Sequence, residues 1–513
     1  MPPTLCNRCG DAVEELECDP RDELAELDAL LERLRLKRFD LKRKINRLHS
    51  PIVRLLPPDV TSTIFEFCLP DLADHKFPRF STYTKEDLSI PLSLGAICIY
   101  WREIAWSTPS LWSSLVVRLP SRLDSDIVAG IAREWLARSG QLPLSIHISS
   151  RFYHESVSAL ADIINQYSAR WSDIDLSMDQ DCYKIFGTDN YAPILKSFRL
   201  HSKFNDYVIN PNFQLICPRL ERASLSFISA KEIMGFNIQW DNLTHLTLHS
   251  TSIKSLFLIL RKTLRLVFCK VSGSCARSRN ESVGAPLLTS LRSLQLIPRI
   301  AEYFFDNLIA PYLEEFRLPR YPISMGAITS FLRRSACSLR SFTVIYGSIV
   351  YRQNFMSFLQ SIPTLNTLSL TNLHVGYTAS EDCDPRHIFQ LVAKVLSSQS
   401  TSLQQGFLPN LKILEFTGDL FLRPGNYCDL YPLPPADNVV HGPFHLFKLD
   451  LHPVTRIPKN MISYIPSLVE RGVTVNVLSK SEDILQSSID YYKCREDYLC
   501  RDWADNFESS LFS

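Results

Sequence analysis

The apolar positions of the chain follow three different spacings, and each spacing predicts a different kind of structure. Between residues 20 and 50 they form two sets, each with a seven-residue period, which is the heptad pattern of a coiled-coil helix. The sets are Leu24, Leu31 and Ile45, interrupted by Arg38, and Leu27, Leu34, Leu41 and Leu48. Asp19 and Pro20 suit a helix start, and Pro51 disfavours continuation. We expect either a coiled-coil dimer or a helix packed against its own chain.

Residues 51–119 show a second spacing, with apolar residues two to four positions apart in two short stretches. Asp59 is positioned to cap the first helix, and residues 92–105 form the apolar face of a later one. A stretch rich in helix breakers, residues 70–90, separates the two. Three tryptophans lie close together, Trp101, Trp106 and Trp112. The pattern predicts a small all-α unit whose aromatic residues form a core, an interface, or both.

Residues 141–478 repeat the motif apolar-x-x-apolar-x-apolar, mostly at intervals of 22 to 26 residues. The last two apolar positions are two residues apart, which is the period of a strand, and a proline often precedes the motif. One long interval has room for a degenerate copy near Leu264–Phe268. Stretches between copies carry apolar residues at helical spacing. We therefore expect an α/β fold in which strand, loop and helix repeat into a curved solenoid.

A polar residue stands between the two inward-facing positions of every copy. The ten are Asp175, Arg199, Ser224, Thr247, Gln295, Arg317, Thr343, Ser369, Glu415 and Asp450. A solvated strand face would be polar in any case. The alternative is a recognition surface, and for it we select as substrate-binding residues Asp175, Arg199, Thr247, Arg317, Glu415 and Asp450.

Composition and the two ends of the chain exclude several classes of function. The net charge of +1 indicates neither nucleic acid nor a membrane surface as partner. No apolar run reaches the roughly 20 residues of a membrane span, and the N-terminus does not resemble a secretory signal. Fourteen scattered cysteines then favour reduced thiols in the cytosol or nucleus. The tail, residues 479–513, is expected to cap the solenoid or to be loosely attached.

The search for catalytic and metal chemistry is negative. Residues 1–19 contain Cys6, Cys9 and Cys18, but a fourth zinc ligand is not evident, so no metal is predicted. His245 and His249 are more consistent with surface residues than with metal ligands. Nucleotide-binding and hydrolase motifs are not found, so no cofactor and no enzyme activity are predicted.

Three submotifs in residues 51–119 resemble the F-box of fungal proteins. They are Leu56-Pro57-Pro58-Asp59-Val60 with Ile64-Phe65, then Ile97-Cys98-x-x-Trp101-Arg102-x-Ile104-Ala105, then Thr108-Pro109-x-Leu111-Trp112. The 70–90 loop is longer than in a compact F-box. The later repeats are similar to a leucine-rich-repeat array, although they lack its polar Asn or Cys step. A Cys-x-x-Cys segment followed by a coiled coil also resembles the fungal arrangement.

The resemblance implies a non-enzymatic substrate-recognition subunit of a Skp-cullin-F-box ubiquitin ligase. The F-box would bind a Skp-type adaptor, and the repeats would hold an unknown protein substrate. The adaptor-binding residues it implies are Leu56, Pro57, Pro58, Ile64, Phe65, Ile97, Trp101, Leu111 and Trp112, of which we expect about half to be structural. One alternative is a repeat-based interaction scaffold without a ligase role that self-associates through the heptads. Another, a hydrolase or metal enzyme, would require a catalytic pocket.

Overall fold

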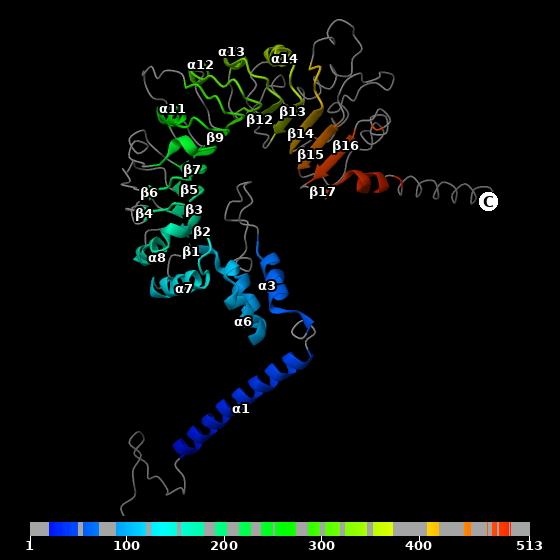
Figure 1. The fold of residues 1–513 in the computed structure, drawn as a ribbon. Coiled ribbons are helices and arrows are strands. Elements are labelled where there is room, and N and C mark those ends of the chain that lie inside the picture. The colour runs from blue at the N-terminus through cyan, green and yellow to red at the C-terminus, as the bar shows by residue number, and fades with distance from the viewer. Residues whose placement is uncertain are drawn as a thin grey trace, which may run out of the picture. The chain divides into compact units, whose positions relative to one another are not determined.

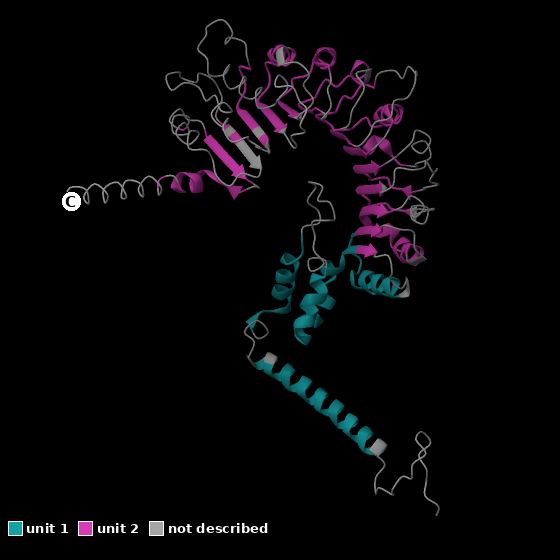
Figure 2. Ribbon diagram, turned by 180° about the vertical axis from the view of Figure 1, so that it is seen from behind, with its two compact units in different colours: residues 1–116, 127–145 teal, residues 117–126, 146–513 magenta. Residues whose placement is uncertain are grey.

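The computed structural model divides the chain into two compact units. It describes residues 20–49, 55–70, 89–119, 125–150, 155–178, 190–202, 215–226, 238–249, 252–272, 286–297, 303–318, 324–345, 352–372, 408–419, 446–452, 469, 474–479, 482–491 and 493. Unit 1 comprises residues 1–116 and 127–145, and unit 2 comprises residues 117–126 and 146–513 (Figure 2). The cysteine-containing segment 1–19 and most of the predicted tail lie outside the described residues.

Unit 1 begins with the predicted heptad helix, α1 (Pro20–His49). Asp22 and Glu23 lie in its first turn, where acidic side chains favour helix formation. Of its described side chains, all are exposed except that of Arg43. The apolar heptad positions are therefore exposed. The helix contacts the rest of unit 1 through Arg43, whose Nη2 lies 3.7 Å from Glu103 Oε1.

The other helices of unit 1 are short. They are α3 (Pro58–Phe67), α5 (Ile90–Ile97), α6 (Ile99–Ser107), the 3-10 turn η2 (Pro109–Trp112) and α7 (Ser125–Arg138). Proline stands in the first turn of α3, α5 and η2, where its missing N–H has no cost. The Cys98 thiol caps α6 by accepting a hydrogen bond from the Trp101 backbone N–H at 3.4 Å.

A tryptophan cluster forms the centre of unit 1. Trp112 is completely buried and contacts Trp106 and Trp135 edge-on, with ring centroids 5.3 and 4.7 Å apart. The Arg138 guanidinium lies over both Trp106 and Trp112, at 5.1 and 4.9 Å from the ring centroids. Gly95 of α5 lies directly against the Trp106 ring, where a Cβ would overlap the indole. Helix α7 thus belongs to the same core as α5, α6 and η2.

Unit 2 is built on one long sheet. Its strands, in spatial order, are β1 (Ser114–Leu119), β2 (Leu144–Ser150), β3 (Trp171–Met178), β5 (Ser197–Ser202), β7 (Arg222–Ser226), β8 (His245–His249), β9 (Phe268–Ser272), β10 (Ser293–Leu296), β11 (Glu315–Arg317), β12 (Ser341–Ile345), β13 (Thr367–Asn372), β14 (Ile413–Asp419), β15 (Leu446–His452), β16 (Thr474–Ser479) and β17 (Glu482–Asp483). From β3 to β16 neighbouring strands are parallel, a run of twelve. Strand β17 pairs antiparallel with β16. A separate two-stranded sheet joins β4 (Asn190–Tyr191) and β6 (Leu215–Ile216).

Helices cover one side of this sheet. They are α8 (Glu155–Asn165), α11 (Ile253–Lys262), α12 (Tyr303–Asp306), α13 (Met325–Ser335) and α14 (Arg352–Gln360), and Figure 1 shows the last four in a row along the strands. Between helices and strands lies a chain of buried phenylalanines in ring contact, Phe257, Phe304, Phe305, Phe316, Phe331, Phe342, Phe355 and Phe358. Apolar burial on both sides of the strand–helix boundary stabilises the layer.

The fold class predicted from the sequence is wrong in two respects. The described residues of unit 2 form one continuous, mostly parallel α/β sheet with helices, and not a leucine-rich-repeat solenoid. Unit 1 is not a small all-α F-box alone, because it also takes in α7 and parts of β1 and β2. The repeated apolar motif encodes a buried strand entered through a turn, and any parallel α/β layer satisfies that requirement.

The predicted strands themselves occur at the expected motifs. Their inward positions, such as Leu246 and Leu248, are fully buried. The degenerate copy expected near Leu264–Phe268 is present a few residues later, as Leu266, Cys269 and Val271, all buried around β9. The motif therefore located strands correctly while the class assigned to them was wrong.

Candidate functional site

An apolar stripe is exposed on helix α3 of unit 1. On α3, Val60, Ile64 and Phe67 are spaced by four and three residues and so lie on one helix face. All three are exposed, and Phe67 is 85% exposed. The adjacent face carries Thr61 and Phe65, which are buried in the unit. One helix thus presents one face to its own core and leaves another exposed.

The core side of α3 is tightly attached to α6 and η2. The Phe65 ring meets the Trp101 ring at a centroid distance of 4.9 Å. The Thr61 hydroxyl donates a hydrogen bond to the Pro57 carbonyl, and the Ser110 hydroxyl donates one to the Glu66 carboxylate. These contacts fix the orientation of the exposed stripe before any partner binds, which reduces the entropic cost of binding.

The nine residues predicted to bind an adaptor separate into surface and core. Pro57, Pro58, Ile64 and Ile97 are exposed, and Leu56 and Trp101 are half-buried. Phe65, Leu111 and Trp112 are buried inside the unit. In unit 1, therefore, three of the nine are structural residues, and the others are at least partly accessible. Trp101 is half-buried against Phe65, so it contributes to the core as expected.

Sequence reasoning left four exposed apolar residues out of the adaptor set. They are Leu55, Val60, Phe67 and Leu92. Val60, which stands in the motif, and Phe67, which follows it, share the Ile64 face of α3 at helical spacing, so the sequence pattern indicates both. Leu55 directly precedes the motif and is 74% exposed. The apolar surface is therefore wider than the motif.

The second candidate surface is the polar face of the sheet in unit 2. Parallel pairing in register places Asp175 beside Arg199, Arg199 beside Ser224, and Ser224 beside Thr247. The same row continues through Lys270, Gln295 and Arg317 to Thr343. A solvated strand face would leave these side chains exposed, but Asp175, Ser224 and Thr247 are all buried. Side chains of this row are therefore packed against their neighbours on adjacent strands.

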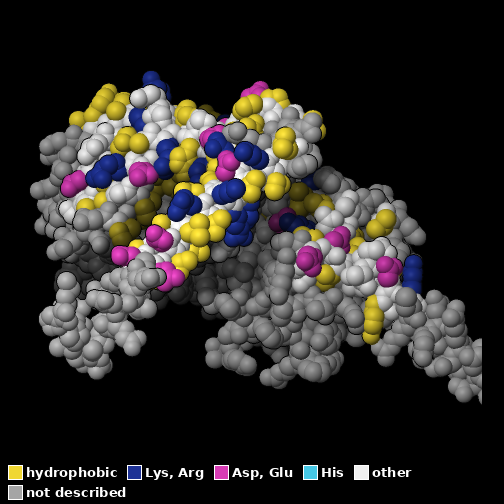
Figure 3. Space-filling model, turned by 90° about the horizontal axis from the view of Figure 1, so that it is seen from below, with side chains coloured by type: hydrophobic (Ala, Val, Ile, Leu, Met, Phe, Trp, Pro, Cys, Tyr) yellow, Lys and Arg dark blue, Asp and Glu magenta, His cyan; other side chains and the backbone are white. Residues whose placement is uncertain are grey.

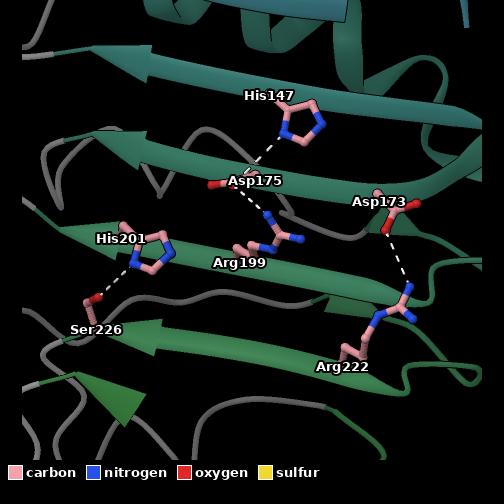
Figure 4. Close-up of polar contacts among 7 residues, drawn as sticks. All are labelled: His147, Asp173, Asp175, Arg199, His201, Arg222 and Ser226. Carbon is pink, nitrogen blue, oxygen red and sulfur yellow. Dashed lines mark hydrogen bonds and ion pairs between the residues drawn. The ribbon is translucent and has the colours of Figure 1, made fainter. Parts of the chain in front are cut away.

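Asp175 is the centre of a charged cluster at the N-terminal end of this row (Figure 4). Its Oδ2 lies 3.4 Å from Arg199 Nη1 and 3.9 Å from His147 Nδ1, while Asp173 Oδ1 lies 3.8 Å from Arg222 Nη2. Asp175 is only 4% exposed, and its Oδ1 has no hydrogen-bond partner among the described residues. A buried carboxylate requires such compensation by cations.

His201 continues the cluster one step along β5. Its Nδ1 lies 3.1 Å from the Ser226 hydroxyl, and its ring meets that of His249 edge-on. Burial lowers the pKa of His201, the nearby Asp175 opposes this shift, and Arg199 reinforces it. Burial therefore favours the neutral form of the His201 imidazole.

Arg317 lies in the middle of the row, with Gln295 and Thr343 as its register partners on the neighbouring strands. It is half-buried, burial lowers its pKa, and its Nε has no hydrogen-bond partner in the described part of the chain. Thr247, by contrast, is buried between neighbouring strands.

At the C-terminal end of the sheet the predicted row is partly wrong. Glu415 pairs in register with Lys448, and their Oε1 and Nζ atoms are 3.8 Å apart. Asp450, which was expected in this row, pairs instead with Thr417, one step further along. The pairing register of β15 with β14 is shifted by two residues from the one that the motif Leu446-Leu449-Leu451 implied. The surface row at this end is therefore Glu415 and Lys448.

The described residues contain no group of three or more His, Cys, Asp or Glu side chains arranged to hold a metal ion. Cys6, Cys9 and Cys18 lie outside these residues. His245 and His249 are both on β8, and His249 contacts the hydroxyl of Ser272 on β9. In the same part of the chain, no helix is long and apolar enough to span a membrane.

Comparison with known proteins does not assign the chain to a family. No family model matches the sequence, and no curated protein matches it. Among solved structures, that of the Rad7 and Elc1 complex in yeast is similar at 14% sequence identity and a TM-score of 0.33, covering 81% of this chain and 97% of that chain. A TM-score this low assigns neither fold nor function, so the residues described above carry the interpretation.

Proposed function

We propose that the chain is an F-box-like protein that serves as the substrate-recognition subunit of a Skp-cullin-F-box ubiquitin ligase. The observation that carries the proposal is the exposed stripe Val60, Ile64 and Phe67 on a helix whose other face is locked into the core by Phe65. This stripe coincides with the segment that resembles an F-box. The ubiquitin transfer itself belongs to the partners.

The stripe has the properties of a helix-in-groove contact. Anchors of this kind occur at i, i+4 and i+7, and aromatic and large aliphatic side chains dominate their binding energy. Ile97 at the end of α5 and Leu55 ahead of α3 are also exposed and extend the apolar surface. Large apolar side chains exposed on one helix face of a folded protein are typical of an interaction site. A Skp-type adaptor is the partner that the F-box resemblance implies.

The sheet surface of unit 2 is the proposed substrate site. Asp175, Arg199 and Arg317 place charges of both signs on one face, in a fixed register. A preorganised array of charged and hydroxyl side chains suits a polar polypeptide segment, because charge complementarity provides specificity. We therefore propose a protein substrate and no catalytic role for these residues.

The test is co-purification of the full chain with a Skp-type adaptor, with matched substitutions. Ile64→Glu is expected to weaken adaptor binding by at least about tenfold, because a charge would enter the apolar contact. Leu56→Ala/Pro57→Ala should also weaken it. Ile131→Glu on α7 is the control, since Ile131 is similarly exposed in the same unit but lies outside the F-box motif. It should bind as the unchanged protein does.

Two results would count against the proposal. If the intact chain does not bind the adaptor, the ligase role fails and an interaction scaffold becomes the better account. If Ile64→Glu and Ile131→Glu weaken binding equally, the α3 stripe is not the contact. Circular dichroism of each variant would show whether loss of binding reflects loss of structure.

A further inference from the structure

Helix α1 exposes an apolar seam along its whole length. Seven leucine and isoleucine residues occupy its two heptad positions, and each is more than half exposed: Leu24, Leu27, Leu31, Leu34, Leu41, Ile45 and Leu48. In proteins, helices gain most of their stability when such an apolar face packs against other elements. A helix of 30 residues with this seam is therefore incomplete without a partner.

The seam is turned away from the rest of unit 1. Taking Leu24 as position a of the heptad, Arg43 falls at position f, opposite the seam. Arg43 is the half-buried residue of the helix, and its Nη2 lies 3.7 Å from Glu103 Oε1 on α6. The face that meets the folded unit is therefore the outer one.

The charges of α1 are segregated along its length. Residues 20–34 contain five acidic and two basic side chains, whereas residues 35–49 contain seven basic and one acidic. In Figure 3 acidic side chains gather at one end of the helix and basic ones further along, with apolar side chains between them. The helix dipole favours this distribution only in the first and last turns. In α1 the acidic residues continue as far as Glu32, and the basic residues predominate from Arg33 onward, well beyond the terminal turns.

We infer that α1 pairs with α1 of a second copy of the chain, in an antiparallel coiled coil. The two-fold axis lies at Leu36, so that Leu24 packs near Leu48 of the other copy and Leu31 near Leu41. The acidic half of each helix then lies along the basic half of the other.

The flanking positions distinguish the two orientations. In a parallel in-register pair the charged g–e contacts are Glu23 with Asp28 and Lys37 with Lys42, all of like sign. An antiparallel pair instead brings Asp28 opposite Lys42 of the other copy, and does so twice by symmetry. These contacts are of opposite sign, so the charges favour the antiparallel orientation.

The break in the seam leads to the same conclusion. In a parallel pair Arg38 would face Arg38 of the other copy inside the apolar layer, which is an unfavourable burial of like charges. In the antiparallel pair Arg38 packs beside Leu34, along which its aliphatic stem can lie. The antiparallel pair does bring two Arg35 side chains and two Lys37 side chains together at its centre. Each Arg35 is neutralised by Glu32 of its own helix at 2.6 Å, and the Lys37 contact is a single like-charge pair against the two attractive pairs of Asp28 with Lys42.

The test of association is sedimentation analysis of the full chain over a concentration series. The expected species has twice the 58.8 kDa chain mass. Leu34→Glu, on the seam, should give a monomer, and Leu36→Glu is the matched control, because Leu36 is 66% exposed on the opposite face. A monomer at all concentrations, or equal effects of the two substitutions, would overturn the inference. Neither outcome bears on adaptor binding, which is tested on α3.

The test of orientation uses charge reversal. Lys42→Glu should raise the dimer Kd roughly fivefold or more in the antiparallel pair, because two attractive contacts with Asp28 become repulsive. In a parallel pair the same change would lower the Kd, because Lys37 would attract the new carboxylate at position 42. Adding Asp28→Lys should restore the original Kd in the antiparallel pair, since the two charges are then simply exchanged. A lowered Kd in the first variant, or no restoration in the second, would refute the orientation.

Discussion

Replacement of Trp112 by alanine should destabilise unit 1 more than any other single change to its surface or core that we describe. Trp112 is completely buried, with its ring against Trp106, Trp135 and the Arg138 guanidinium. Its Nε1 donates a hydrogen bond of 2.7 Å to the Ala105 carbonyl. The substitution removes all of these contacts at once and leaves a cavity that the three flanking side chains cannot fill.

The cost follows from the separate contributions. Truncation of a buried tryptophan to alanine costs about 3–5 kcal/mol. The unpaired carbonyl adds about 1 kcal/mol, and the lost guanidinium contact about 0.5–1 kcal/mol. The expected loss of about 4.5–7 kcal/mol is comparable with the whole stability of many domains, which is about 5–15 kcal/mol. Trp112→Phe, which keeps most of the ring volume, should cost clearly less.

Hydrogen exchange read by mass spectrometry measures this loss locally. Because α7 packs into the same cluster through Trp135, amide protection should fall in both α6 and α7 of Trp112→Ala. Ile131→Ala, an exposed position on α7, should leave protection unchanged. If α6 and α7 of Trp112→Ala keep protection within about threefold of the unchanged protein, the tryptophan cluster does not hold unit 1 together and the reasoning is wrong.

Three further results are expected. Burial raises the pKa of both Cys217 and Cys269 to about 12, so iodoacetamide at about pH 8 should modify exposed Cys68 far faster than either, as peptide mapping would show. Burial lowers the pKa of His201, so the unfolded chain binds that proton more tightly than the folded chain does. This group therefore leaves the free energy of unfolding unchanged above about pH 6.5 and lowers it as the pH falls below that value. His201→Gln should flatten this pH dependence in urea unfolding. Gly95→Ala should lower the thermal midpoint through overlap with the indole above it, and an unchanged midpoint would contradict that packing.

Local structure could be read from the sequence because each signal was local. The heptad spacing from Leu24 to Leu48 predicted α1, and the strand period of Leu246 and Leu248 predicted β8. Pro20 marked the start of α1. All of these depend on residues within one or two turns of each other, where spacing determines which side chains share a face.

The arrangement of elements could not be read in the same way. A buried parallel strand and a strand of a repeat solenoid require the same apolar spacing, so the motif did not distinguish them. The membership of α7 in unit 1 depends on Trp135 reaching Trp112, a contact between residues far apart in the sequence. No local pattern reports such a contact.

The candidate surfaces show the same division. Motif matching chose Phe65, Leu111 and Trp112 as contacts, whereas burial makes them core residues. It omitted Phe67, although helical spacing places Phe67 on the same face of α3 as Ile64. In the sheet, the row from Asp175 to Arg317 was correctly aligned, but the place of Asp450 was wrong because strand register at β15 depends on pairing with β14.

The short antiparallel strand β17 has a consequence for how unit 2 behaves in a crowded solution. A long parallel sheet ends in a row of free backbone N–H and C=O groups, which is a template for runaway strand addition by other chains. Here the described edge beyond β16 is only two residues long, and both, Glu482 and Asp483, are exposed acids. Repulsion between like charges would oppose stacking of a second copy there. The two exposed acids therefore disfavour addition of another strand at this edge, and their replacement by apolar residues would make edge-to-edge association easier.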